Sequence, residues 1–439
     1  MLDILTDRTY RHLFAAQVVA LLGTGLATVA LGLLAYDLAG DGAGMVLGTV
    51  FTIKMVAYVG IAPIAGAFAD RVPRRALLVA LDLVRAGAAL CLPFVTEAWH
   101  VYVLIFLLQS ASAAFTPTFQ ATIPDVLPDE ARYTRALSLS RLAYDLENIV
   151  SPTLAALLLA AVSYNALFLG TVMGFAASAL LVMSVLLPSP KSSERRGVYE
   201  RTTRGIRIYL ATPRLRGLLA LNLVAAAAGA MVLVNSVVLV RGTLGLSASA
   251  LAWTMFAFGA GSILAALALP RTLDRVPDRP VMAGGAALMV ITLLGLAIVI
   301  ASLGLSWPVL LAAWLLMGLG YSAVLTPSGR LLRRSSQPED RSMLFAAQFA
   351  LSHACWLAAY PLSGWLLTQF GAAAALGVLA VLACAGGLTA LLLWQKDDAE
   401  IREHNHDNLP LNHPHLNGER RHAHPFVIDD NHPRWASNL

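Results

Sequence analysis

Long apolar runs alternate along the chain with short polar stretches. The runs repeatedly reach the roughly 20 residues that a helix needs to cross the hydrocarbon core of a bilayer. We therefore predict an all-α membrane protein. Its twelve spans are expected at residues 12–36, 45–69, 76–96, 100–123, 138–162, 165–187, 216–240, 248–270, 281–302, 307–327, 343–369 and 372–394.

The composition supports a membrane protein. Of the 439 residues, 58% are hydrophobic and 13% are charged, whereas a soluble protein has about 25% charged residues. The three cysteines all lie inside apolar runs, so the sequence predicts no disulfide framework and no paired-cysteine metal site. The first apolar run is longer than the core of a cleavable signal peptide.

The basic residues give the expected orientation. All but four of the 31 Lys and Arg residues fall at the termini, in the linker or in alternate loops; the exceptions are Lys54, Arg85, Arg141 and Arg241. Positive residues accumulate on the cytoplasmic side of a membrane protein. We therefore expect a multi-pass protein of a bacterial cytoplasmic (inner) membrane, surrounded by lipid, with both termini in the cytoplasm. Nothing in the chain predicts nucleic-acid binding.

The two halves of the chain repeat each other. Residues 69–75 (ADRVPRR) follow the second span, and residues 273–279 (LDRVPDR) follow the eighth. Thr-Pro pairs, Pro-acidic-acidic triplets and single prolines recur with offsets of about 209 to 210 residues. We infer two pseudo-symmetric six-helix bundles with alternating access between them, at residues 1–188 and 216–395. A cytoplasmic linker at 189–215 joins them, and a tail at 396–439 is expected to be disordered.

Seven of the 10 histidines gather in that tail. They form three His-x-His pairs at nine-residue intervals and one further histidine. In an extended segment, positions i and i+2 point the same way about 6.5 Å apart, and two imidazoles so placed suit a borderline metal ion such as Ni²⁺, Zn²⁺ or Cu²⁺. The predicted metal ligands are His404, His406, His413, His415, His422, His424 and His432.

The stretch at 66–75 carries a family resemblance. It resembles the G-x-L-a-D-r-x-G-r-[RK] signature between the second and third spans of the major facilitator superfamily, with Phe68 in place of Leu and Pro73 in place of Gly. The resemblance implies the superfamily's two-bundle fold. It also implies that the signature residues gate the cytoplasmic side, which here are Asp70, Arg71, Arg74 and Arg75.

Two spacings extend this expected gate. Asp70 and Arg74 stand four residues apart, which suits an ion pair if the segment is helical. Asp82 and Arg85 stand three apart in the next span and would complete the network.

Charged residues inside the spans are the other candidates for function, because each costs about 2.5–3.5 kcal/mol at the centre of a membrane helix. Asp145 lies four residues after Arg141, so an ion pair is one interpretation and a place on the transport path, with Asn148, is the other. Glu147 has no cation on its own helix face. We expect it to line the path as a metal ligand or proton carrier.

Three further residues are candidates. His353 lies near the middle of the eleventh span, where it is either a packing residue or a ligand. Lys54, in the second span, either pairs with Asp37 at the outer end of the first span or repels cations outward.

A finer resemblance suggests the cargo. The pattern that begins at Arg11 resembles the drug and siderophore exporters of the superfamily. With the histidine-rich tail, the chain resembles the nickel-resistance exporters of that branch. We predict export of a divalent transition metal, nickel before cobalt, by proton antiport. The alternatives are efflux of an organic drug or siderophore, and a metal sensor that transports nothing. The chain has no ATP-binding loop and no zinc-protease motif, so we expect neither an enzyme nor a cofactor.

Overall fold

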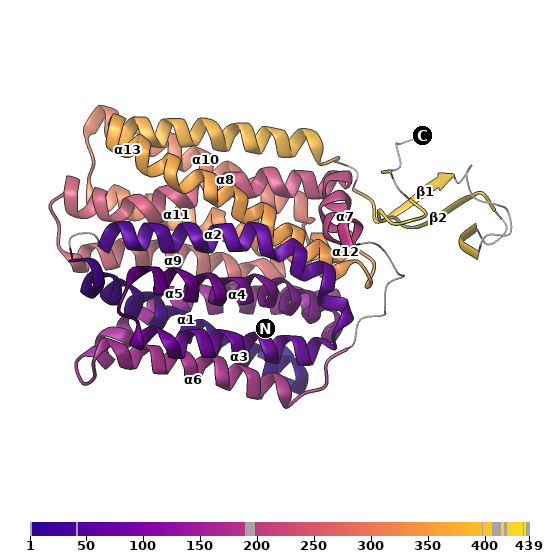
Figure 1. Cartoon of the computed structure of the whole chain (residues 1–439). Coiled ribbons are helices and arrows are strands. Elements are labelled where there is room, and N and C mark those ends of the chain that lie inside the picture. Colours follow the sequence, from indigo (N-terminus) through magenta and orange to yellow (C-terminus); the bar gives the residue numbers. More distant parts are fainter. Residues whose placement is uncertain are drawn as a thin grey trace.

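Long helices lie side by side in the computed structural model of the chain, and a small hairpin projects from one end of them (Figure 1). The structure describes residues 2–40, 43–188, 198–396, 398–405, 414–416, 419–432 and 434–435. We call the end that carries α7, α12 and the hairpin the tail end.

The N-terminal half runs from η1 to α6. Its elements are η1 (Leu2–Thr6), α1 (Arg8–Ala39), α2 (Ala43–Phe68), η3 (Ala69–Arg71), α3 (Arg74–Cys91), η4 (Leu92–Phe94), α4 (Ala98–Val126), α5 (Glu130–Leu159) and α6 (Tyr164–Met183). Those of the C-terminal half are α7 (Val198–Ala211), α8 (Pro213–Val237), η5 (Val238–Thr243), α9 (Ala248–Leu273), α10 (Asp278–Leu303), α11 (Trp307–Leu325), α12 (Ser328–Arg334) and α13 (Arg341–Leu393). The tail contains β1 (Ile401–Asn405), η6 (Pro414–Leu416) and β2 (Arg421–Pro425).

The helices agree with twelve membrane spans. Among the described residues, 10 helices are long and apolar enough to cross a membrane. The helix α5 is as long as these but carries several charges. The helix α13 holds the two last predicted spans, which meet at Gly371, where φ is 79°, a conformation that glycine adopts without strain. The fold is therefore the predicted one.

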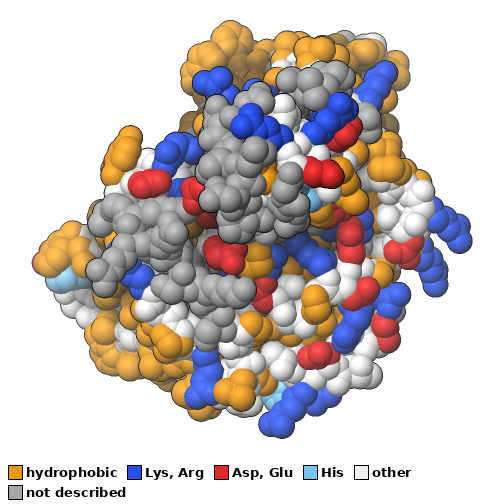
Figure 2. Space-filling view, turned by 90° about the vertical axis from the view of Figure 1, so that its right-hand side faces the viewer, with side chains coloured by type: hydrophobic (Ala, Val, Ile, Leu, Met, Phe, Trp, Pro, Cys, Tyr) orange, Lys and Arg blue, Asp and Glu red, His pale blue; other side chains and the backbone are white. Residues whose placement is uncertain are grey.

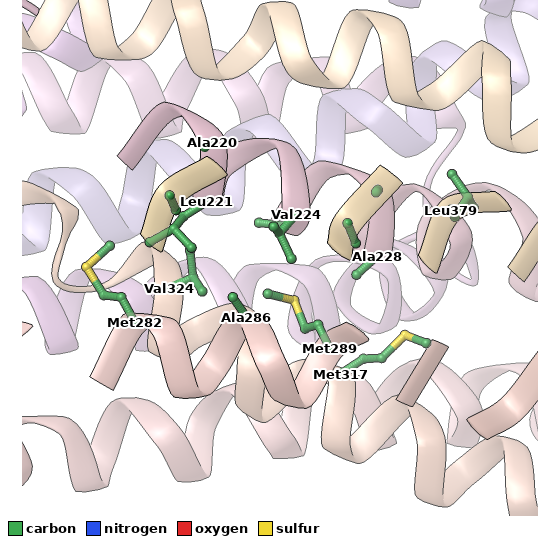
Figure 3. Packing of buried hydrophobic residues seen from close by; sticks show 14 of the residues in the cluster. Ala220, Leu221, Val224, Ala228, Met282, Ala286, Met289, Met317, Val324 and Leu379 are labelled. Carbon is green, nitrogen blue, oxygen red and sulfur yellow. The ribbon is translucent and has the colours of Figure 1, made fainter. Parts of the chain in front are cut away.

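The C-terminal half contains the larger hydrophobic core, built from α8, α10, α11 and α13 (Figure 3). Met282, Met289 and Met317 fill the space against Leu221 and Val224. Flexible methionine side chains suit such irregular gaps.

Small residues bring the helices of this half together. A Cβ atom added to Gly261 of α9 would strike the backbone of α11, and one added to Gly318 of α11 would strike the backbone of α9. Membrane helices have little hydrophobic drive to associate, so close backbone packing of this kind supplies much of the attraction.

The predicted linker is partly a helix. Residues 198–211 form α7, and its Ile208 and Tyr209 are buried against the C-terminal half. The hydroxyl of Tyr209 donates to Oε1 of Gln348 in α13 at 2.5 Å. The basic residues of this part of the linker share an amphipathic helix with the apolar ones, and its apolar face is covered.

The tail also differs from the expectation of disorder. Strands β1 and β2 pair in antiparallel register, with His404 opposite His422. Phe426 and Ile428, which follow β2, are buried in the core cluster of the C-terminal half. The polar composition of the tail predicted disorder, but these apolar residues anchor it to the bundle.

Candidate functional site

Ion pairs connect the two halves at the tail end. Asp125, at the end of α4, pairs with Arg74 of its own half and with Arg341 of α13 in the other half. Arg330 of α12 contacts Glu130 of α5 at 2.7 Å and donates to the hydroxyl of Thr134 at 2.6 Å. We call Arg74, Asp125, Glu130, Arg330 and Arg341 the tail-end gate. These contacts hold the two halves together at this end.

Lys, Arg, Asp and Glu side chains gather on the tail-end face of the molecule (Figure 2). Two further contacts support the gate. Arg333 donates to the carbonyl of Pro128 in the N-terminal half. Asp278 of α10 lies 2.9 Å from Arg330 and 3.2 Å from Arg334. The positions of α10 and α12 are thereby fixed relative to each other.

The structure brings one predicted gate residue, Arg74, into this gate. Arg71 and Arg75 are exposed, and Arg71 lies 4.9 Å from the ring centre of Phe68. The backbone of Asp70 lies in η3, and its side chain is outside the part of the chain that the structure describes.

The pair Asp82–Arg85 lies elsewhere, inside the N-terminal half. Both residues are buried; Ser178 of α6 donates to Asp82 at 2.7 Å, and the Arg85 guanidinium lies 3.9 Å from the ring centre of Phe115. The expected ion pair is present, but it connects α3 with α4 and α6. The prediction that Asp82 and Arg85 complete the gate is therefore corrected, because the pair lies two turns into the membrane span.

Sequence reasoning missed most of the gate. In the sequence, Arg330 and Arg341 belong to the basic loops that indicate orientation, and no local pattern distinguishes Asp125. One signal was available: the Pro-acidic-acidic triplets at 128–130 and 338–340 recur in both halves. Their repetition marks equivalent corners of the two bundles, and the gate forms where these corners meet.

A second set of polar residues, Lys54 of α2, Glu147 of α5 and His353 of α13, is related through the charge of Lys54. Lys54 interacts electrostatically with Glu147 and with His353. The Lys54 ammonium lies 5.6 Å from the ring centre of Tyr58, and the Tyr58 ring stands edge-on to His353 at 4.8 Å. We call Lys54, Glu147 and His353 the central polar group. It consists of an ammonium and a carboxylate from the N-terminal half and an imidazole from the C-terminal half.

The orientation of each member has a local cause. Nδ1 of His353 donates to the Phe349 carbonyl, one turn earlier, at 2.7 Å, which directs the other ring nitrogen away from the helix backbone. A Cβ atom added to Gly25 of α1 would lie 3.1 Å from Oε1 of Glu147 and would collide with Ser151. Glu147 and Ser151 therefore share the face of α5 that lies against α1, as their spacing predicted.

The remaining charged residues in the spans have partners. Arg141 bonds Asp145 at 2.6 Å and Ser262 of α9 at 3.0 Å, so the ion pair that the spacing predicted is present. Asp37 accepts from the hydroxyl of Tyr164 at 2.5 Å. Neither of the two interpretations of Lys54 predicts its electrostatic interaction with Glu147. The side chain of Asn148 lies outside the described part of the chain.

The histidines form a third site, in the tail. We call His404, His415, His422 and His424 the histidine cluster; one nitrogen from each lies within 4.8 Å of the others. Nε2 of His415 lies 3.3 Å from Nε2 of His422 and 3.2 Å from that of His424. Metal–nitrogen bonds of about 2.0–2.1 Å in a tetrahedron place neighbouring nitrogens about 3.3–3.4 Å apart. The cluster is close to that geometry.

Local structure explains how the cluster forms. Alternation along β2 directs His422 and His424 to one face, the ladder puts His404 opposite His422, and His415 comes from η6. His432 joins them, with Nε2 3.0 Å from Nε2 of His404. His406 and His413, also predicted as ligands, lie outside the described residues.

The protonation of the cluster suits a metal. Burial first, and then the charge on His432, His424 and His422, lower the pKa of His415 to about 4. Burial likewise lowers the pKa of His404. These imidazoles are neutral at pH 7, and a neutral imidazole is the form that binds metal.

The two six-helix halves, the gate that joins them at one end and the polar group between them define a class of membrane transporter. The sequence profile of the Major Facilitator Superfamily matches residues 13–240 and 218–414. The chain therefore belongs to the Major Facilitator Superfamily of membrane transporters.

Two comparisons by sequence point to partial relatives. Macrolide efflux protein A of Streptococcus pyogenes is 27% identical over 181 residues, which cover 40% of this chain and 44% of the relative. The uncharacterized MFS-type transporter YfiS of Bacillus subtilis is 26% identical over 264 residues, 58% of this chain and 62% of the relative. The matches thus span about half of each relative's length.

Two solved structures share the fold. The human organic anion transporter MFSD10 (TETRAN) superposes with a TM-score of 0.74 at 14% identity, over 87% of this chain and 99% of that one. A bacterial homologue of the iron transporter ferroportin, in its outward-facing state, gives a TM-score of 0.71 at 15% identity, over 88% and 98%.

Proposed function

We propose that the chain is a secondary active exporter that exchanges a divalent transition metal, nickel or cobalt, for protons. The observation that carries the proposal is the histidine cluster, because four imidazoles at near-coordination distances have little use except to bind such a metal. We place the tail end, and with it the cluster, in the cytoplasm of a bacterial inner membrane. Metal would then be captured on the side from which it is exported.

The central polar group supplies the transport chemistry in this proposal. Glu147 and His353 offer the carboxylate and imidazole ligands that nickel and cobalt accept. Lys54 balances the charge of Glu147 when no cargo is bound, and it competes with an incoming metal ion. Binding is therefore weak, which favours release. A proton that arrives on Glu147 from outside removes the metal's ligand and completes the exchange.

The remaining candidates of this path have smaller roles. Asp145 fixes Arg141 against α9 and so positions α5. Asp37 lies at the far end of α1, where its carboxylate is exposed and accepts from Tyr164. We place it at the exit of the path.

A second cargo class is an organic compound. Two observations favour it. One relative, macrolide efflux protein A, is named for the export of macrolides, which are organic compounds. In addition, aromatic rings lie near the interface between the halves: Tyr321 under the Arg141 guanidinium at 4.8 Å, and Trp356 at 6.1 Å from Tyr321. Aromatic faces attract organic cations.

Flux into inverted membrane vesicles tests both candidates. With a pH gradient imposed, Ni²⁺ and Co²⁺ uptake is measured beside uptake of erythromycin. The metal proposal predicts metal uptake that collapses with the gradient. Glu147→Gln and His353→Ala should abolish it, whereas the matched changes Glu97→Gln and His100→Ala, at the opposite end of the bundle, should leave it intact.

Three results discriminate the alternatives. Erythromycin uptake without metal uptake would replace the metal proposal by the organic one. Full metal flux in both Glu147→Gln and His353→Ala would refute the proposed path. No flux of either cargo would favour a metal sensor that transports nothing. Deletion of the tail should only weaken metal uptake, because capture is separate from translocation.

A further inference from the structure

The histidine cluster is connected to the tail-end gate by a short chain of side chains. Arg204 of α7 lies in its middle. Its Nη1 donates to Oδ1 of Asp430 in the tail at 2.8 Å, and its Nε and Nη2 donate to the two carboxylate oxygens of Asp340 at 2.6 and 2.8 Å. A guanidinium that binds a carboxylate through two parallel bonds fixes its orientation as well as its position.

On one side, this bridge reaches the gate directly. Asp340 is the residue that precedes α13, and the next residue, Arg341, forms the ion pair with Asp125 that connects the two halves. Any movement of Asp340 relative to Arg204 therefore acts on the backbone that carries Arg341. The Arg204 and Asp340 side chains are 10% and 6% exposed, so water screens this contact little.

On the other side, the bridge reaches the histidines. The carboxylate of Asp429 accepts from Nδ1 of His432 at 2.7 Å and from the backbone amides of Asn431 and His432 at 2.9 Å each. This turn holds His432 and Asp430 in one rigid unit. A carboxylate on one ring nitrogen also directs the other nitrogen, the arrangement that orients imidazoles toward metal ions; here that nitrogen lies 3.0 Å from His404.

The tail has a second attachment to the bundle. The ring of Trp435 lies 5.2 Å from the guanidinium of Arg214 in α8 and 5.1 Å from that of Arg402 in β1. Phe426 packs edge-on to Trp435 at 5.3 Å. Strand β1 is therefore held near α8, and the turn at Asp429 is held near α7. Both attachments hold the part of the tail that carries the histidine cluster.

We propose that the histidine cluster is a regulatory metal site, and that a divalent metal ion bound there holds the tail against the bundle and, through Arg204, keeps the tail-end gate closed. The thermodynamic reason is linkage. With the tail docked, the imidazoles lie at near-coordination distances. A metal ion therefore binds the docked state more tightly than a state with the tail released, and metal binding shifts the population toward the docked state. The inference rests on metal binding by the tail, as the proposed function does, but it holds whichever cargo is exported.

Zn²⁺ is a suitable probe, because it is diamagnetic and tetrahedral sites accept it. Spin labels placed at Ala76 of α3 and Val276, both exposed residues at the tail end of opposite halves, report the gate by electron–electron distance measurement on the full chain, with the three cysteines replaced. Zn²⁺ at 100 times its dissociation constant should increase the ratio of closed to open gate, by about 100-fold where it binds the closed state alone. Calorimetry on the same samples gives Zn²⁺ binding separately.

Two variants separate binding from coupling. The double change His422→Gln and His424→Gln removes two ligands, so both Zn²⁺ binding and the shift should be lost. Arg204→Gln leaves the cluster intact, so Zn²⁺ should still bind while the shift disappears; Arg204→Lys, which keeps the charge, should restore part of it. His12→Gln, a histidine outside the tail, is the matched control and should change neither.

Several outcomes would overturn the inference. Zn²⁺ binding by the unaltered chain without a shift in the gate would show that the site does not regulate it. A full shift in Arg204→Gln would show that the bridge carries no coupling. Failure to bind Zn²⁺ at all would remove the site itself. A regulated gate combined with absent metal flux would leave this inference standing while refuting metal as the cargo.

Discussion

Replacing Asp125 by Asn is expected to open the tail-end gate. In the closed gate, Asp125 contacts Arg74 and Arg341, and the Arg341 side chain is 10% exposed. When the halves separate at this end, the contact with Arg74 persists because both residues belong to the N-terminal half. Of the two contacts that Asp125 makes, only the one with Arg341 differs between the closed and the open gate, so only this contact enters the effect of the substitution.

The magnitude follows from that single contact. A hydrogen bond between charged groups contributes about 1.5–3 kcal/mol net when partly buried. Its loss should therefore lower the ratio of closed to open gate by about 10- to 150-fold. The distance between spin labels at Ala76 and Val276 measures this ratio, and it should shift to longer values in Asp125→Asn without metal.

Asp3→Asn is the matched control for this change. Asp3 pairs with Arg135 at 2.5 Å at the same end of the molecule, but both residues lie in the N-terminal half and the Asp3 side chain is 55% exposed. Exposed pairs contribute about 0–1 kcal/mol, and this one does not join the halves. An unchanged distance in Asp125→Asn, or an equal shift in Asp3→Asn, would refute the reasoning.

Two further predictions concern thermal unfolding in detergent. Gly25→Ala places a methyl group against Ser151 of the neighbouring helix and should destabilise the protein by about 1–3 kcal/mol, whereas Gly32→Ala, which meets nothing within 4 Å, should be neutral or stabilising; equal melting temperatures for both would contradict the α1–α5 packing. Asp82→Asn leaves the buried Arg85 charge without its carboxylate and should cost about 3–5 kcal/mol, and an unchanged melting temperature would show that the pair contributes nothing.

The span pattern was predictable because the bilayer imposes it. A run of apolar residues near 20 long has one stable structure in hydrocarbon, since every backbone group must be paired within the helix. The same argument fails at the tail. Its composition predicted disorder, but its described part is ordered by Phe426, Ile428 and Trp435, which pack against the C-terminal half. No local sequence pattern describes the surface of the bundle that they contact.

In the candidate sites, too, contacts within one helix were predictable from the sequence, whereas contacts between helices were not. Arg141 and Asp145 share one helix, so their spacing alone predicted the pair. The spacing of charges along α5 predicts no cation on the helix face of Glu147, and the cation that acts on Glu147, Lys54, belongs to another helix. Pairs between helices require the packing of the whole fold, and a single sequence specifies it only through the sum of many weak contacts.

The arrangement of the three sites explains why a transporter would carry a folded tail. In the proposed mechanism, the tail-end gate on its own would respond only to cargo bound at the central polar group. Arg204 adds a second input, because the same guanidinium holds Asp340 beside the gate and Asp430 beside the histidines. Once one carboxylate has ordered the Arg204 side chain, binding the other costs less conformational entropy, so the ordering of either element favours the other. Metal that orders the tail thus acts on the gate without entering the membrane, and the gate in turn affects how tightly the tail holds metal.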